Sequence, residues 1–365
     1  MLNNPLKILC CLTLAATLLA ANTARAQGGA SQAPVIFQKA KWYDLPLFGF
    51  RAGGYISLQF LKLRGNKWEF TPHDLSLFLS RDFSSRLHFF SEAEIGDAFV
   101  VSGSHISTRR TEVDLERFYL DYQATTRAGV RFGKFLTPVG RWNLIHADPL
   151  VWTVSRPLTT AAAFSRHASG LMLHGTLPVG RTDMDYSVYA DDSDALDPTQ
   201  RNELAFPDPM PVSTFNPRNV FKHAFGLRLV HRSFNDSLQV GFSAAHFQLE
   251  DIARSKNLLG TDVFWTVNRI EISAEGIYRT NADNNSTDEW GGFVQLVVPL
   301  SHHLYAVGRH ERFKAHVVPE AATIQTLGII YAPTPPVKIK FEHRGGRHNG
   351  KLAPDGWFAS FSMLL

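Results

Sequence analysis

The chain has 365 residues, 44% of them hydrophobic, which is enough for one large domain with a sizeable apolar surface. Its 37 basic and 33 acidic residues leave a formal charge of only +4, which argues against a nucleic-acid-binding or polybasic membrane-binding protein. The two cysteines, Cys10 and Cys11, lie near the N-terminus, so disulfides, thiolate metal sites and cysteine nucleophiles are excluded from the remainder.

The N-terminus has the pattern of a secretory signal peptide. A lysine precedes the short apolar stretch 8–21, which is too short to cross a bilayer as a helix. Residues 24–26 then read Ala-Arg-Ala, an A-x-A cleavage pattern. We therefore predict cleavage between Ala26 and Gln27, with residues 1–26 removed and the protein exported.

From residue 54 to the C-terminus, apolar and polar residues alternate in short runs. Phe225, Leu227 and Leu229, for example, share one face and Arg228 lies on the other. This period of two is the spacing of β-strands with two unlike faces. The alternation predicts strands near residues 54–63, 73–82, 85–98, 111–124, 127–136, 166–177, 181–191, 220–233, 236–249, 256–266, 269–281, 288–299, 302–314, 321–332, 336–347 and 356–365.

The connections between these runs alternate in length. Short ones such as 178–181 separate longer ones rich in Gly, Asn, Asp and Pro, of which the longest are near 137–165 and 191–219. Tight turns on one rim and long loops on the other are typical of outer-membrane β-barrels. We predict sixteen strands, and fourteen or eighteen are the alternatives because 111–124 and 256–266 alternate poorly.

The predicted organisation is a signal peptide at 1–26, a short periplasmic segment at 27–50 and an all-β, transmembrane antiparallel barrel at 51–365. A large soluble β-sandwich is the alternative fold, but its outward faces would be polar and charged. Aromatic residues cluster near the predicted strand ends, which fits aromatic girdles at two membrane interfaces.

A local motif adds a family resemblance. The stretch from Val130 to Trp142 reads VRFGKFLTPVGRW. It resembles the fifth strand and the entry to the third loop of Gram-negative outer-membrane porins, and is most similar to the phosphate-selective porin O/P-like group, in a run of the type R-x-G-(K/R)-F-x-x-P-x-G. The resemblance implies a sixteen-stranded barrel, often a homotrimer, whose long third loop folds into the lumen and narrows the pore. No run of closely spaced lysines or arginines points to a dedicated phosphate site.

The predicted third loop carries charges that would lie where such a pore is narrowest. Guanidinium groups at a constriction attract anions and raise the barrier for cations. The predicted constriction residues are Arg141, His146, Asp148, Arg156 and Arg166. Alternatively, these arginines pair with carboxylates of the facing wall.

The predicted pore wall is mixed in charge, which would orient polar solutes without excluding either sign. Its predicted residues are Arg131, Arg228, Arg232, Lys338, Lys340, Arg344, Glu92, Glu94, Glu271 and Glu275.

The sequence therefore predicts a porin-type channel for passive diffusion of small hydrophilic solutes, with a mild anion preference. The alternatives are a barrel enzyme that hydrolyses lipid or peptide, and a structural barrel that holds a partner protein. We expect no cofactor, metal site or catalytic site, because the 15 histidines are scattered and no G-x-S-x-G or P-loop is present. The expected partners are outer-membrane lipid and lipopolysaccharide, small polar or anionic solutes and further copies of this chain in a homotrimer, but no nucleic acid.

Overall fold

The computed structural model describes residues 41–45, 48–145, 147–197, 218–281, 288–316 and 318–365. The predicted signal peptide, its cleavage site at Ala26 and Gln27, and the predicted constriction residue His146 lie outside these residues.

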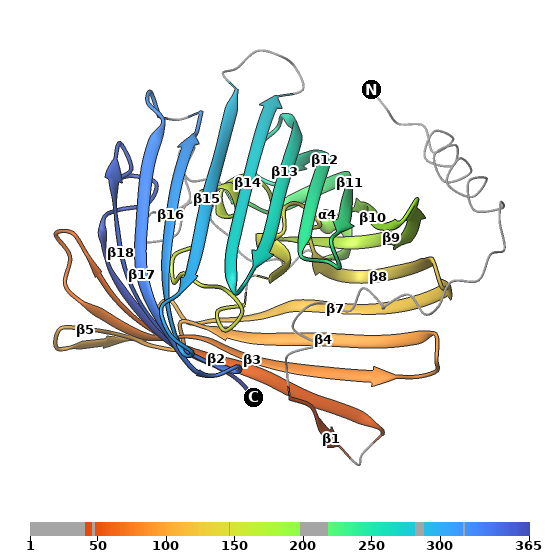
Figure 1. Cartoon of the computed structure of the whole chain (residues 1–365), viewed down its shortest axis with the longest axis horizontal. Helices are drawn as coiled ribbons and strands as arrows, with labels where there is room; N and C mark the ends of the chain where they lie inside the picture. Colours follow the sequence, from red (N-terminus) through yellow and green to blue (C-terminus); the bar gives the residue numbers. More distant parts are fainter. Residues whose placement is uncertain (1–40, 46–47, 146, 198–217, 282–287, 317) are drawn as a thin grey trace. The chain divides into compact units, whose positions relative to one another are not determined.

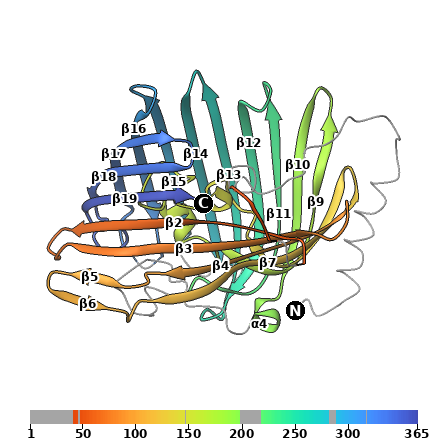
Figure 2. The same ribbon diagram turned by 90° about the horizontal axis from the view of Figure 1, so that it is seen from below.

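Within the described residues, the chain forms an antiparallel sheet that closes on itself (Figures 1 and 2). Neighbouring strands pair in chain order, and the last pairs with the first, with Ser360 opposite Gln59. The sixteen long strands are β2 (Phe50–Leu63), β3 (Glu69–Asp82), β4 (Leu87–Gly96), β7 (Glu112–Thr125), β8 (Ala128–Leu136), β9 (His167–Val179), β10 (Thr182–Asp191), β11 (Phe221–Ser233), β12 (Leu238–Leu249), β13 (Ser255–Val267), β14 (Ile270–Asn281), β15 (Glu289–Pro299), β16 (Leu304–Lys314), β17 (Ala322–Thr334), β18 (Val337–Arg347) and β19 (Gly356–Leu364). The prediction of a closed sixteen-stranded barrel is confirmed, and each predicted boundary lies within four residues of the observed one.

Three short strands were not predicted, because a three-residue strand carries no readable alternation. Strand β1 (Tyr43–Leu45) pairs with β2, so the segment predicted as a periplasmic extension also contributes to the sheet. Strands β5 (Val100–Ser102) and β6 (His105–Ser107) form a hairpin in the loop after β4.

The two faces of the sheet differ as the alternation predicts. On the outer face, Leu77, Phe132 and Leu327 are 61%, 55% and 66% exposed. On the inner face, Ser57 and Thr326 are fully buried. A soluble sandwich would have the reverse arrangement, since its apolar faces pack against each other and its polar faces meet water. The exposed apolar belt suits a barrel with apolar surroundings.

The inner face is polar and largely filled by paired charges. Arg117 bonds Glu92 at 2.6 Å, and Arg228 bonds Asp262 at 2.6 Å, with all four side chains at most 5% exposed. Such pairs satisfy buried charges that would otherwise be costly. None of the helices in the described part of the chain has the length and apolar run that a bilayer crossing needs.

The long connection between β8 and β9, residues 137–166 (loop L3), lies inside the ring of strands. It contains the short helices η1 (Trp142–Ile145) and α3 (Leu158–Ala161). Its side chains Val139 and Phe164 are 1% and 2% exposed and pack in one cluster with strand residues. The predicted folding of the third loop into the lumen is therefore confirmed.

Candidate pore constriction

Two glycines of the porin-like motif occupy backbone conformations that favour glycine, Gly133 within β8 and Gly140 where L3 enters the lumen. Gly133 has φ +127°, and an added Cβ would lie 2.1 Å from the Phe118 carbonyl oxygen. Gly140 has φ +65°, and a Cβ there would lie 2.5 Å from a carboxylate oxygen of Glu275. Other residues rarely adopt these backbone conformations and would clash at both places. The motif therefore encodes the path of the loop.

The base of L3 is closed by one side chain. Asn143 is fully buried, and its amide donates to the carbonyl oxygens of Thr137 and Arg166 at 2.9 and 3.0 Å. These two residues begin and end the loop, and the Thr137 N–H also donates to the Arg166 carbonyl oxygen at 2.9 Å, so both bonds join the loop ends.

Carboxylates of the barrel wall accept hydrogen bonds from L3. Glu275 on β14 accepts from the Trp142 backbone N–H at 2.5 Å, and Glu271 accepts from the Trp152 indole N–H at 2.6 Å. Glu342 on β18 accepts from the backbone N–H of the consecutive residues 154 and 155, at 2.7 and 3.0 Å. Hydrogen bonds to a charged acceptor are stronger than neutral ones, so these contacts hold the loop in place.

Cations of the same wall donate to carbonyl oxygens of L3. Lys340 donates to the Asp148 carbonyl at 2.7 Å and to its carboxylate at 2.8 Å. Lys338 donates to the carbonyl oxygens of residues 150 and 151, both at 3.2 Å, and Arg309 donates to that of Ser155 at 2.9 Å. Although burial opposes the charge of Asp148, the Lys340 ammonium holds its pKa below the ordinary value.

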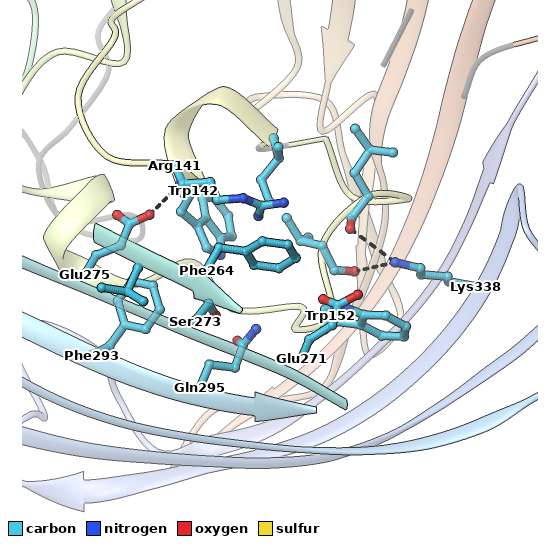
Figure 3. Close-up of a pocket in the computed structure, with 14 residues that line it drawn as sticks. Arg141, Trp142, Trp152, Phe264, Glu271, Ser273, Glu275, Phe293, Gln295 and Lys338 are labelled. Atoms are coloured by element: carbon cyan, nitrogen blue, oxygen red, sulfur yellow. Dashed lines mark hydrogen bonds between the residues drawn. The ribbon is translucent and has the colours of Figure 1, made fainter. Parts of the chain in front are cut away.

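A smaller cavity of about 270 Å³ lies between L3 and the strand ends that carry the short turns (Figure 3). Arg141, Phe264, Glu271 and Lys338 are among its lining residues. The Arg141 guanidinium lies 3.6 Å from the centre of the Phe264 ring, a cation–π contact. Burial lowers the pKa of Arg141, against the opposing effect of the carboxylates Glu271 and Glu275.

A larger cavity of about 540 Å³ lies on the side of the long loops. Arginines from L3 and β18 line it together with carboxylates from β3, β4 and β7. These charged lining residues are Arg156, Arg166, Arg344, Asp74, Glu94, Glu112, Asp114 and Glu116. Trp142 and Val151 line both cavities, so these two L3 residues stand at the boundary between them.

The predicted constriction residues are distributed over both cavities. Arg141 lines the smaller one, and Asp148, Arg156 and Arg166 line the larger one. Their roles in a constriction stay a prediction.

Most of the predicted wall residues form hydrogen bonds or ion pairs inside the barrel. Besides the residues that bind L3, the recorded partners are Arg117 for Glu92, Tyr55 and Ser76 for Glu94, Asp121 for Arg131, Asp262 for Arg228, Asp185 for Arg232 and the Pro354 carbonyl for Arg344. Glu92 and Glu94 are thus held by strand residues. Arg166, at the end of L3, does pair with a wall carboxylate, Glu116, at 3.8 Å, as the alternative expected.

Sequence reasoning missed an aromatic row inside the barrel. Tyr55, Phe78, Phe90 and Tyr119, on β2, β3, β4 and β7, are at most 3% exposed, and successive ring centroids are 5.9, 5.8 and 5.6 Å apart. The signal was present, because Phe78 and Phe90 stand at positions of the polar face. The row fills the lumen along these strands.

Comparison with known proteins places the fold. No protein-family model matches the chain. An uncharacterized protein of Aquifex aeolicus (strain VF5) is 35% identical over 111 residues, which are 30% of this chain and 24% of that protein. The chain thus spans about a quarter of that relative's length.

Solved structures match over nearly the whole barrel. Salmonella typhi OmpF in complex with daunomycin aligns with a TM-score of 0.59 and 7% identity, over 87% of this chain and 98% of that chain. The barrel has the porin fold. An anion-selective porin from Comamonas acidovorans aligns at 0.55 and 10% identity, over 87% and 99% of the two chains. The outer membrane channel DcaP of Acinetobacter baumannii aligns at 0.55 and 10%, over 88% and 99%. At such low identity the likeness to porins concerns the fold alone.

Proposed function

We propose that the protein is a porin-type channel of the bacterial outer membrane, exported with residues 1–26 removed, that passes small hydrophilic solutes by passive diffusion. The observation that carries this proposal is L3, which charged wall residues hold across the lumen between two cavities whose linings include charged residues. A loop fixed in this way narrows a barrel without closing the space on either side of it.

The outer surface supports a membrane location. Exposed apolar side chains such as Phe225, Phe242 and Val294, at 50%, 42% and 56% exposure, would be unfavourable in water but favourable in lipid. The aromatic residues Trp265 and Trp357, 44% and 50% exposed near strand ends, suit the two interfaces.

We propose that the channel has a mild anion preference, set mainly by Arg156 and Arg344. Both line the larger cavity, where several carboxylates are already held by basic partners: Asp97 by Arg110 at 3.0 Å, Asp148 by Lys340 at 2.8 Å, Asp114 by Lys134 at 3.6 Å and Glu116 by Arg166 at 3.8 Å. The remaining carboxylates oppose the arginines, so the preference is small. The likeness of the motif to the phosphate-selective O/P-like group supports an anionic solute but names no particular one.

A homotrimer is the assembly that we propose, since the family resemblance implies it and a trimer form of Vibrio cholerae OmpT is among the similar structures. Native electrophoresis with chemical cross-linking tests it, and a monomer at all protein concentrations would contradict it.

The neighbouring serine and histidine do not favour a hydrolase. The Ser165 hydroxyl donates to the His167 carbonyl oxygen at 2.7 Å, whereas the His167 imidazole lies 2.7 Å from Glu116. A serine nucleophile needs its hydroxyl on the imidazole, so this geometry does not activate it.

Planar-bilayer conductance of the purified protein tests the proposed function. We expect discrete open-channel steps and a reversal potential of small anion-selective sign in a KCl gradient. A closed barrel that hydrolyses lipid or peptide would instead identify an enzyme. A closed barrel without activity would identify a structural barrel that holds a partner.

A further inference from the structure

The outer face of β16 interrupts the apolar belt. Arg309 and Glu311 point inward and are 3% and 1% exposed, so the even-numbered residues of this strand face outward. At the end next to the long loops these are His310 and Arg312, both exposed. A basic pair on the lipid-facing side of a barrel strand is costly at the membrane midplane, so both its depth in the membrane and what it binds there need an explanation.

Strand register extends this pair into a patch. Arg312 lies opposite Thr323 of β17, which in turn lies opposite Arg347 of β18. Strands are spaced about 4.8 Å apart, so the two arginines start about 10 Å from each other. His343, on the same face of β18, packs 4.4 Å from the Trp357 ring. His310, Arg312, His343 and Arg347 are all exposed and form what we call the outer basic patch.

Tryptophan side chains locate the patch relative to a bilayer. Trp290 of β15 lies opposite Lys314, and Arg312 is the next outward residue toward the short turns, with its guanidinium 5.6 Å from the Trp290 ring. Tryptophan prefers the interface between hydrocarbon and headgroups. The outer basic patch therefore lies at headgroup level on the long-loop rim.

In the described part of the chain, Arg312 and Arg347 form no ion pair or hydrogen bond with a carboxylate. The outward residues of β15 to β18 include no Asp or Glu, and Glu320, which lies outside these strands, contacts His348 at 2.6 Å. A second copy of the chain that presented the same strands would bring no neutralising charge. Charge complementarity therefore favours an anionic lipid headgroup over a protein surface.

We propose that the outer basic patch binds the phosphate groups of a phosphorylated glycolipid in the outer leaflet. Two arginines about 10 Å apart suit a headgroup with more than one phosphate, because a single phosphate cannot contact both closely. This inference rests on the proposed outer-membrane location, in which the long loops face outward.

Native mass spectrometry of the full-length barrel in phosphatidylcholine nanodiscs tests the site, with added bis-phosphorylated lipid A, its dephosphorylated form or phosphatidylglycerol. We expect the double variant Arg312→Gln/Arg347→Gln to bind the phosphorylated glycolipid about 30-fold more weakly, since one basic residue near an anionic lipid surface contributes about fivefold in affinity. The matched control, Arg64→Gln/Lys67→Gln, removes the same charge from an exposed loop on the same rim and should bind like the wild type.

Three results would overturn the site: equal binding by the double variant, equal loss in the control, or equally tight binding of phosphatidylglycerol or the dephosphorylated glycolipid. A double variant that loses self-association in glycolipid-free detergent would instead assign the patch to a second copy. Conductance in glycolipid-free bilayers separates this inference from the proposed function, because the double variant should conduct like the wild type. Unchanged heat-modifiability shows that the variant is folded.

Discussion

The two halves of the barrel interior use charged residues in different ways. On β4, β7 and β8, charges pair from strand to strand, as in Arg117 with Glu92 and Arg131 with Asp121 at 2.6 and 2.5 Å. On β14, β16 and β18, they bind the backbone of L3 instead, as Lys340 does at 2.7 Å. The same alternation and residue types thus stabilise the wall in one half and position a loop in the other.

Of the changes considered, removing the charge of Lys340 should have the largest effect, because it removes one of the contacts by which the barrel wall holds L3. Lys340→Met leaves Asp148 buried without its ion-pair partner, which costs about 3–5 kcal/mol. We expect L3 to detach, giving larger and noisier single-channel openings in planar bilayers. The double variant Lys340→Met/Asp148→Asn should recover quieter openings, because it leaves no buried charge. Quiet steps of wild-type size in the single variant would show that this pair does not hold the loop.

A charge on the outer face should impair assembly more than one on the inner face. Phe242→Arg places a charge in the lipid-facing belt, at a cost of about 2–4 kcal/mol near the midplane. Gln239→Arg lies on the polar face of the same strand and should be tolerated. Ser243 is an unsuitable control because it is fully buried and bonds Arg228 at 3.1 Å. Heat-modifiability on gels measures assembly, and similar behaviour of both variants would refute the assignment of the faces.

Charge reversal in L3 should change ion selectivity unequally at its two arginines. Arg156 lines the larger cavity, whereas Arg141 is stacked on Phe264 in the smaller one. We expect Arg156→Glu to shift the reversal potential in a KCl gradient toward cations, and Arg141→Glu to shift it less. Both shifts should diminish at high salt, because the screening length falls from about 10 Å at 0.1 M to about 3 Å at 1 M. Two variants with the wild-type reversal potential would place both arginines outside the ion path.

Acid should break the Asp148–Lys340 contact of L3 only at low pH, which is the smallest effect expected near neutrality. The pKa of Asp148 is held below its ordinary value of 3.8, so its ion pair contributes fully above that pH. The contribution is lost as the pH falls through the lowered pKa. The part of the channel noise that depends on Lys340 and Asp148 should therefore stay constant from pH 7 to about pH 4 and rise below it, and the Lys340→Met variant should lack this rise. An onset near pH 6 would assign the transition to another group.

The fold was readable from sequence because strand alternation is a local property. Successive side chains point to opposite faces whatever the remainder of the chain does, so residues such as Phe242 and Ser243 reveal their faces without knowledge of any partner. The inward folding of the third loop was expected only from the family resemblance, although Gly140, at the start of L3, occupies a backbone conformation that favours glycine. The three short strands were not readable because they contain too few residues to show a period.

The sequence by itself determined the lipid-facing and inner faces, the presence of a long charged third loop and a strand number of about sixteen, with fourteen and eighteen as alternatives. Only the tertiary structure decided which charges meet, because the partners are far apart along the chain: Lys340 and Asp148 are separated by 192 positions. It likewise decided that Arg141 and Arg156 face different cavities, and that Arg312 and Arg347 share one patch across β17. Alternation specifies the face on which a side chain lies, whereas strand register and loop path specify its neighbours.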